Sequence, residues 1–90
     1  MIIKSIEYSR KFVKKFKKLP QHIVKIAIEK EKLFKNNPLH PSLRLHALHG
    51  NLQGSWSISL TSNYRIIFKQ MNDDNIVFAS IGKHDIYKCL

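Results

Sequence analysis

The apolar residues of this chain change their spacing near residue 43, and that change limits the folds open to it. Before it, apolar residues recur at helical spacing over residues 10–19 and again over 21–36. After it, they alternate in four short segments, at 43–48, 54–60, 64–70 and 75–82, which is the spacing of half-buried strands. Residues 2–8 are rich in isoleucine and read as one further short strand. The predicted order is therefore β-α-α-β-β-β-β.

Short turn-like links, "HGNLQ", "TSN" and "NDDN", separate the four later segments. Links of this length favour antiparallel neighbours. Ser9 can cap the first helix, and Pro20 suits the break before the second. We predict an α+β fold over residues 1–90 as a single domain: β-α-α followed by an antiparallel meander, with both helices packed on one face of a small sheet.

The register of this meander can be predicted by requiring that its apolar side chains share one buried face. A four-residue turn at 72–75 pairs residues whose numbers sum to 147, and a three-residue turn at 61–63 aligns the preceding strand. One face is then wholly apolar, carrying Trp56, Ile58, Leu60, Tyr64, Ile66, Phe68, Val77, Ala79 and Ile81. The opposite face carries Ser55, Ser57, Ser59, Arg65, Lys69, Ser80 and His84. Gly82 lies across from Arg65, which makes His84 its diagonal neighbour.

The charge of the chain is strongly unbalanced, with 16 Lys and Arg against 6 Asp and Glu and a formal net charge of +10. Such a balance favours polyanionic partners, nucleic acid first. Five lysines lie on the side of the first helix away from its apolar stripe of Phe12, Val13, Phe16 and Leu19: Lys11, Lys14, Lys15, Lys17 and Lys18. A solvated face is the ordinary outcome for a charge run, but a run without an acidic partner favours binding to a nucleic-acid backbone. We add Arg44, Lys69 and Lys83 to the predicted RNA-binding residues.

Other features indicate the compartment. The single Cys89 cannot form an intramolecular disulfide, which fits a reducing, cytoplasmic location. Lys4 and Glu7 interrupt any signal-peptide core, and no apolar run is long enough to span a membrane. We predict a cytoplasmic protein without a membrane partner.

Four residues could carry chemistry. His84 titrates near neutral pH and could transfer a proton, although it could also be an ordinary surface residue. Arg65 could clamp a phosphate or be simply an exposed strand residue. Tyr87 could stack on a base or pack against the core. His46 is a candidate for a second proton-transferring group.

A metal site is not predicted. His40, His46 and His49 are spaced by six and three residues, which fits no familiar set of ligands, and their surroundings are cationic. No Gly-rich phosphate loop or paired carboxylates are present, and we predict no cofactor and no small-molecule substrate.

The motifs "HPSLRLHAL", "GSWS", "YRIIF" and "IGKHD" resemble those of the RelE/ParE superfamily of bacterial toxins from type II toxin–antitoxin systems. The nearest branch is the YafQ-like, ribosome-dependent mRNA endonucleases. In this resemblance Arg65 matches the strand arginine that stabilises the scissile phosphate, and His84 the catalytic histidine near the C-terminus. His46 matches the upstream histidine of the YafQ pattern, and Tyr87 an aromatic near the C-terminus. A further His and Asp of that pattern are absent near "SLTSNY".

The resemblance implies a toxin that cleaves mRNA in the ribosomal A site without a metal, by attack of the substrate's own 2′-OH. His46 would be the base, His84 the acid, and Arg65 would offset the developing charge. The implied partners are the ribosome, mRNA and a cognate antitoxin that is acidic and partly disordered. Two alternatives stay open: a ParE-like inhibitor of DNA gyrase without nuclease activity, and an inactive toxin remnant.

Overall fold

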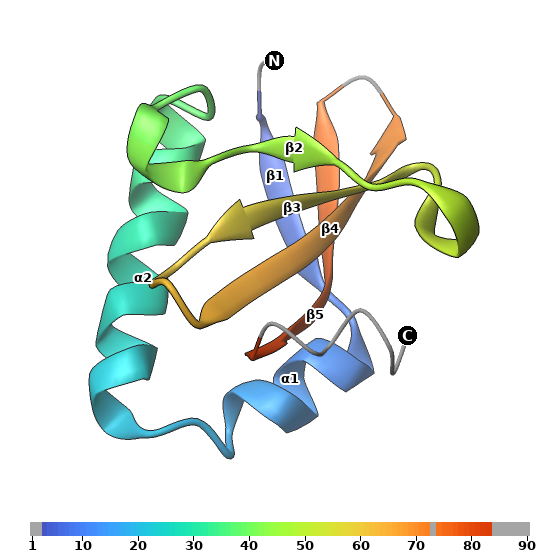
Figure 1. Cartoon of the computed structure of the whole chain (residues 1–90). Helices are drawn as coiled ribbons and strands as arrows, with labels where there is room; N and C mark the ends of the chain where they lie inside the picture. The colour runs from blue at the N-terminus through green and yellow to red at the C-terminus, as the bar shows by residue number, and fades with distance from the viewer. Residues whose placement is uncertain (1–2, 73, 84–90) are drawn as a thin grey trace.

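The computed structural model describes residues 3–72 and 74–83, and in this part of the chain five strands form one sheet in the order β1-β5-β4-β3-β2 (Figure 1). The strands are β1 (Ser5–Tyr8), β2 (His46–Ala47), β3 (Ser55–Ser59), β4 (Tyr64–Asn72) and β5 (Asn75–Lys83). The helices are α1 (Arg10–Phe16) and α2 (Gln21–Asn36), with short 3₁₀ turns at Pro41–Leu43 and Gly50–Leu52. In the view of Figure 1, α2 runs along one flank of the sheet and α1 crosses its lower end. The predicted α+β class, with two helices against a small sheet, is confirmed.

The sheet is mixed, because β1 joins it in parallel. Strand β1 pairs with β5 from Ser5 opposite Asn75 to Tyr8 opposite Phe78. The pairs β2–β3, β3–β4 and β4–β5 are antiparallel, as the short links predict. The meander and the existence of a strand within residues 2–8 were therefore predictable, while the parallel pairing of β1 with β5 was not indicated by local spacing.

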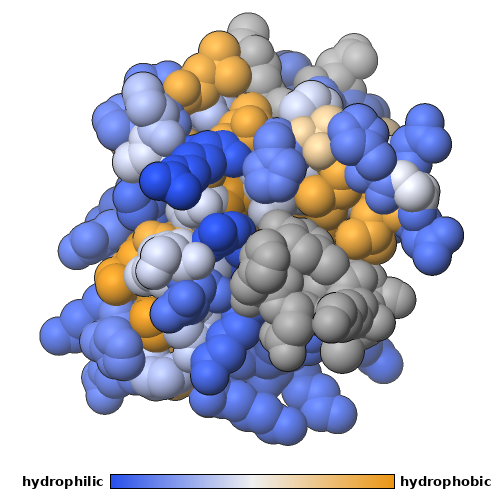
Figure 2. Space-filling model, viewed as in Figure 1, coloured by the Kyte–Doolittle hydropathy of each residue, from blue (hydrophilic) through white to orange (hydrophobic). Residues whose placement is uncertain are grey.

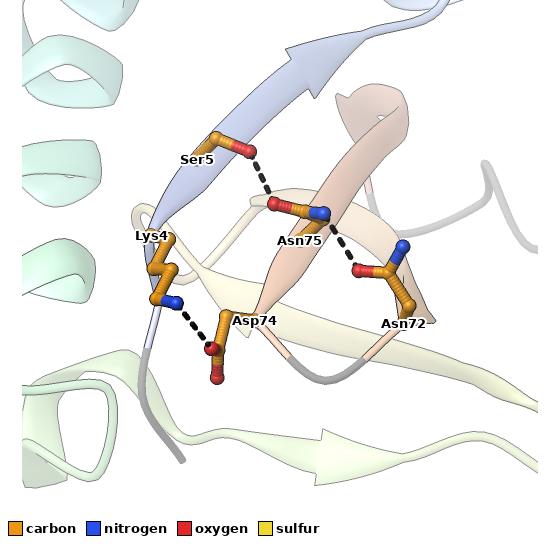
Figure 3. Close-up of polar contacts among 5 residues, drawn as sticks. All are labelled: Lys4, Ser5, Asn72, Asp74 and Asn75. Atoms are coloured by element: carbon orange, nitrogen blue, oxygen red, sulfur yellow. Dashed lines mark hydrogen bonds and ion pairs between the residues drawn. The ribbon is translucent and has the colours of Figure 1, made fainter.

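Polar contacts hold the start of β1 against the turn between β4 and β5 (Figure 3). Lys4 forms an ion pair with Asp74, with the ammonium nitrogen 3.3 Å from a carboxylate oxygen. Ser5 donates a hydrogen bond to the Asn75 side chain at 2.7 Å, and Asn75 in turn donates to Asn72 at 2.6 Å. These contacts connect two segments that are distant in sequence and support the parallel pairing.

Both helices begin where the sequence predicts. The Ser9 hydroxyl accepts a hydrogen bond from the Phe12 amide at 3.0 Å and caps α1. Helix α1 is shorter than the predicted 10–19 and ends at Phe16, because a turn then leads to Pro20. Helix α2 has the predicted bounds, and Pro20 occupies its N-cap position.

The core lies between the helices and one face of the sheet. Phe34 of α2 is fully buried between Phe68 and Phe78, with ring centroids 5.0 and 6.0 Å away. Phe12 of α1 contacts Phe78 at 5.5 Å. Val13 was predicted to share the apolar stripe of α1, but 38% of its surface is exposed. Its position one residue after Phe12 turns it away from the sheet and toward the groove between the helices.

The predicted register is correct between β3 and β4 and only partly correct between β4 and β5. Ser55 lies opposite Lys69 and Ser59 opposite Arg65, as a three-residue turn requires. Between β4 and β5 the numbers of paired residues sum to the predicted 147 from Tyr64 to Ile67. The register shifts by one residue at Phe68. The prediction that Val77 and Ala79 face the core is therefore wrong.

A β-bulge at Ala79 causes this shift. Ile67 pairs with Ser80 while the next residue, Phe68, pairs with Phe78, so Ala79 is an extra residue in β5. Ile76 and Phe78 consequently face the core and are almost completely buried. The physical reason is that the Phe78 ring fills the space between Phe12, Phe34 and Phe68, which the Ala79 methyl group could not fill.

The predicted strand at 43–48 is reduced to two residues. Pro41–Leu43 form a 3₁₀ turn, and Arg44 ends it in the left-handed conformation with φ of 48°. Leu43 is fully buried by this turn. Because Arg44 is not extended, the prediction that Arg44 and His46 lie side by side on one strand face is wrong.

Candidate active site

The sheet face opposite the helices carries four serines, Ser55, Ser57 and Ser59 of β3 and Ser80 of β5, and is called the serine face below. The prediction that these residues share a face with Arg65 and Lys69 is confirmed by the register. Polar residues on the outer face of a sheet are usually exposed to solvent, but all four serines are buried, with exposed fractions between 0 and 7%. Ile67, which lies between them, is buried as well. The serine face is therefore lined with small hydroxyl groups, with longer polar side chains around it.

Two rows of paired residues organise the serine face. The first row runs across four strands through His46, Ser57, Ile67 and Ser80. The second row contains Ser59, Arg65 and Gly82. Because neighbouring strands lie about 4.8 Å apart and residues i and i+2 about 6.8 Å, His46 and Arg65 are roughly 12 Å apart at their backbones. Both are long enough to contact one nucleotide linkage between them.

Arg65 is half-buried and is the middle residue of the second row, between Ser59 and Gly82. Its Nη1 donates to the Thr61 carbonyl at 2.6 Å and to the Tyr64 carbonyl at 3.0 Å. Guanidinium has five N–H donors in a fixed plane, and the contacts to described residues use only Nη1, so among these residues the three donors of Nε and Nη2 are left for an anion. Gly82, directly opposite, has no side chain to occupy the adjacent space. The arrangement suits a phosphate held at the edge of the serine face.

His46 lies at the β2 end of the first row and is exposed. Its Nδ1 is 2.9 Å from the Arg44 carbonyl oxygen. A carbonyl can only accept a hydrogen bond, so Nδ1 is the protonated nitrogen when the ring is neutral. Nε2 then has a free lone pair and can accept a proton, which is what a general base requires. The left-handed Arg44 matters here because its carbonyl fixes the ring.

Two of the four predicted site residues, His84 and Tyr87, lie outside the described residues. The predicted proximity of His84 to Arg65 therefore stays a prediction.

The predicted RNA-binding residues occupy different surfaces. Four lysines of the first helical segment, Lys11, Lys14, Lys17 and Lys18, are exposed, and hydrophilic side chains gather along the lower edge of the molecule, where α1 lies (Figure 2). Lys69 is exposed on the serine face, opposite Ser55. Lys83 lies opposite Tyr64, which the register places on the helix side of the sheet, and Arg44 is exposed at the end of the 3₁₀ turn Pro41–Leu43.

The structure also reveals contacts that the sequence did not indicate. Lys15 is half-buried and donates from Nζ to the Ser80 hydroxyl at 3.2 Å, so one lysine of α1 reaches the serine face. The carbonyls of Thr61 and Tyr64 that hold Arg65 are backbone groups, which no residue-type motif can reveal. In the sequence, the serines at alternate positions of "SWSIS" indicate that one face of this strand is polar.

An apolar groove of about 440 Å³ lies between α1 and α2, on the helix side of the sheet. Val13 and Ile28 line it, and Tyr8 donates a hydrogen bond to Glu31 across it. Arg10, Lys14, Lys17 and Lys18 line a neighbouring depression. The groove is on the opposite side of the sheet from His46 and Arg65 and is separate from the candidate active site.

Within residues 3–72 and 74–83, no group of three or more His, Cys, Asp or Glu side chains is placed to hold a metal ion. No helix in the described ranges has the length and apolar content needed to cross a membrane.

Several solved structures share this fold. The crystal structure of YafQ from E. coli strain BL21(DE3) is 23% identical at a TM-score of 0.78, covering 93% of this chain and 97% of that chain. The YoeB–YefM complex from Staphylococcus aureus is 24% identical at 0.72, covering 89% and 95%. The DinJ–YafQ complex from E. coli is 20% identical at 0.65, covering 92% and 96%. The chain therefore has the α+β fold that the YafQ and YoeB toxins share.

A family model narrows this class. The model described as "Bacterial toxin of type II toxin-antitoxin system, YafQ" matches residues 4–87. The chain belongs to this family of YafQ toxins, which confirms the resemblance drawn from its motifs. Comparison with curated protein sequences gives no significant match.

Proposed function

We propose that this toxin is a metal-independent endoribonuclease that cleaves mRNA in the ribosomal A site. The observation that carries the proposal is the placement of His46 and Arg65 on one sheet face, with the Nδ1 of His46 hydrogen-bonded to the Arg44 carbonyl, so that Nε2 carries the lone pair of the neutral ring. A protein that only binds DNA gyrase has no need of a proton acceptor beside a phosphate clamp. The match to the YafQ family supports the same function.

The proposed reaction uses the substrate's own 2′-OH as nucleophile. His46 Nε2 accepts the 2′-OH proton while the O2′–P bond forms, and the P–O5′ bond breaks as His84 gives a proton to O5′. The products are a 2′,3′-cyclic phosphate and a 5′-OH. Arg65 binds the non-bridging oxygens, where negative charge increases in the transition state.

The same proposal assigns the partners. The exposed lysines of the first helical segment, Lys11, Lys14, Lys17 and Lys18, would bind ribosomal RNA and mRNA in the cytoplasm together with Arg44, Lys69 and Lys83. A cognate antitoxin, acidic and partly disordered, would bind these basic surfaces, as a net charge of +10 favours. Two of the solved toxins of this fold are in complexes named YoeB–YefM and DinJ–YafQ. We further infer a single domain, because β1 and β5 pair across most of the chain length.

Cleavage of a programmed mRNA on purified ribosomes tests the proposal. We expect wild type to cut at A-site codons. Removing an acid or a base, in His46→Ala or His84→Ala, should lower the rate by about 10²–10⁴-fold. Arg65→Ala should lower it by about 10²–10³-fold. His22→Ala is the matched control, since His22 is exposed on α2 and far from the serine face in sequence and fold.

Two outcomes would contradict the proposal. If folded wild-type protein leaves the mRNA intact, the supercoiling activity of DNA gyrase should be measured next; inhibition there would establish the gyrase alternative. Failure in both assays would identify an inactive remnant, consistent with the absent His and Asp near "SLTSNY".

A further inference from the structure

Lys15 differs from the other lysines of the first helical segment. It is half-buried, whereas Lys11, Lys14, Lys17 and Lys18 are exposed. Its Nζ donates to the Ser80 hydroxyl at 3.2 Å, across from α1 to β5. This contact is possible because α1 follows the edge of β5 beyond the end of β1, where Ser9 binds the carbonyls of Phe78 and Ala79.

The bulge at Ala79 places Ser80 where Lys15 can reach the serine face. In a regular strand Ser80 would point to the same side as Phe78, into the core. The extra residue reverses this alternation, so Ser80 lies opposite Ile67 on the serine face. β-bulges commonly redirect a side chain in this way beside functional sites.

Lys15 and Arg65 thus approach one area from two directions. Ser80 is two residues from Gly82, about 6.8 Å along the strand, and Gly82 lies directly opposite Arg65. Arg65 comes from the sheet and is fixed by two carbonyls, while Lys15 comes from the helix and is fixed by Ser80. Gly82, which has no side chain, is the neighbour of both Arg65 and Ser80 in the sheet.

Within residues 3–72 and 74–83, Lys15 uses only part of its hydrogen-bonding capacity. An ammonium group has three N–H donors, and among the described residues its hydrogen-bond acceptor is the Ser80 hydroxyl. No carboxylate in residues 3–72 or 74–83 lies within 4.0 Å of its Nζ. A half-buried cation that has a neutral partner and spare donors is suited to an external anion.

We propose that Lys15 binds the RNA phosphate that Arg65 clamps, as a second cation of the cleavage site and not as part of the surface that grips ribosomal RNA. The proposal rests on the proposed nuclease function. Lys15 stays protonated throughout and donates hydrogen bonds to the phosphate oxygens, while Ser80 holds its side chain over the serine face. Two cations on one phosphate offset more of the charge that develops during attack than one alone.

Single-turnover cleavage on ribosomes separates the two roles of the lysines. Lys15→Met should lower the rate at saturating toxin by about 100-fold, the lower end of the effect of removing one preorganised donor, with ribosome affinity unchanged. Lys14→Met and Lys18→Met should instead weaken ribosome binding. Lys25→Met, at an exposed residue of α2 outside the predicted RNA-binding residues, is the matched control and should leave both the rate and the ribosome affinity unchanged. A Lys15→Met variant that cleaves at the wild-type rate would overturn the proposal.

A second measurement does not depend on cleavage activity. The Lys15 side-chain resonances of the wild-type protein should move on titration with a trinucleotide carrying 2′-O-methyl groups, which cannot be cleaved, and Arg65→Ala should reduce this shift. Lys14 resonances should move less. If the mRNA is not cleaved but Lys15 still responds, the nuclease proposal fails while the phosphate site stands. Equal or smaller shifts at Lys15 than at Lys14 would refute the phosphate site.

Discussion

Tyr8 is the residue with the most strongly perturbed titration in the described part of the chain. Its hydroxyl donates to the Glu31 carboxylate across the groove between the helices. Burial, followed by the hydrogen bond to Glu31 and the charge of Glu31, raises the pKa of Tyr8 to about 12, from an ordinary 10.0. Deprotonation would remove the donor and place two negative charges side by side.

This contact predicts a loss of stability at high pH. Because the pKa of Tyr8 is higher in the folded than in the unfolded protein, its contribution is complete below about pH 10 and is lost as pH rises through about 12. Urea unfolding over this range should show the free energy of unfolding falling more steeply in wild type than in Tyr8→Phe. NMR titration of the Tyr8 ring should give a lower pKa in Glu31→Gln. Equal pH slopes for wild type and Tyr8→Phe would contradict the assignment.

The start and the position of helix α1 depend on the side chain of Ser9. Its hydroxyl accepts from the Phe12 amide and donates to the Ala79 carbonyl at 2.8 Å, so one side chain connects the helix cap to the bulge in β5. The helix has only seven residues, too few to be stable alone in water. Its position, and therefore that of Lys15, depends on these tertiary contacts.

We accordingly expect Ser9→Ala to lower the free energy of unfolding by about 0.5–2 kcal/mol, the range for loss of an N-cap. Ser9→Thr keeps a hydroxyl and should recover part of this loss. Ser62→Ala, in the exposed turn between β3 and β4, should change stability by no more than about 0.5 kcal/mol. These values can be measured by urea denaturation. A Ser9→Ala variant as stable as Ser62→Ala would show that the cap is dispensable.

For the molecule as a whole, the excess of positive charge should govern binding to the ribosome. Each RNA phosphate that the toxin no longer neutralises makes the slope of log affinity against log salt shallower, by roughly 0.7 for single strands and 0.9 for duplexes. The double variant Lys14→Gln/Lys18→Gln should therefore bind ribosomes with a slope shallower by about one to two. It should keep its thermal stability, because both lysines are exposed. The slope can be obtained by measuring ribosome affinity at several salt concentrations between low and physiological salt. A slope equal to that of wild type would exclude these two lysines from the RNA-binding surface.

Local periodicity and turn length were sufficient to predict much of this protein. They gave the bounds of α2, the cap at Ser9, the register between β3 and β4, and the face that Arg65 shares with the serines. Each of these features is decided by side chains close together in the chain. The YafQ-like motifs likewise lie within continuous segments, which is why the family could be identified from them.

The tertiary structure alone decided the parallel pairing of β1 with β5, the bulge at Ala79, the left-handed Arg44 and the contact between Lys15 and Ser80. The pairing, the bulge and the contact between Lys15 and Ser80 depend on residues distant in sequence, and Arg44 ends the turn that contains the buried Leu43. The bulge forms because Phe78 fills a space bounded by rings from α1, α2 and β4, and the shape of that space exists only after the helices pack on the sheet. The shift in register that places Phe78 in the core also turns Ser80 toward Lys15. Packing of the apolar face thus determines which polar groups meet on the other face.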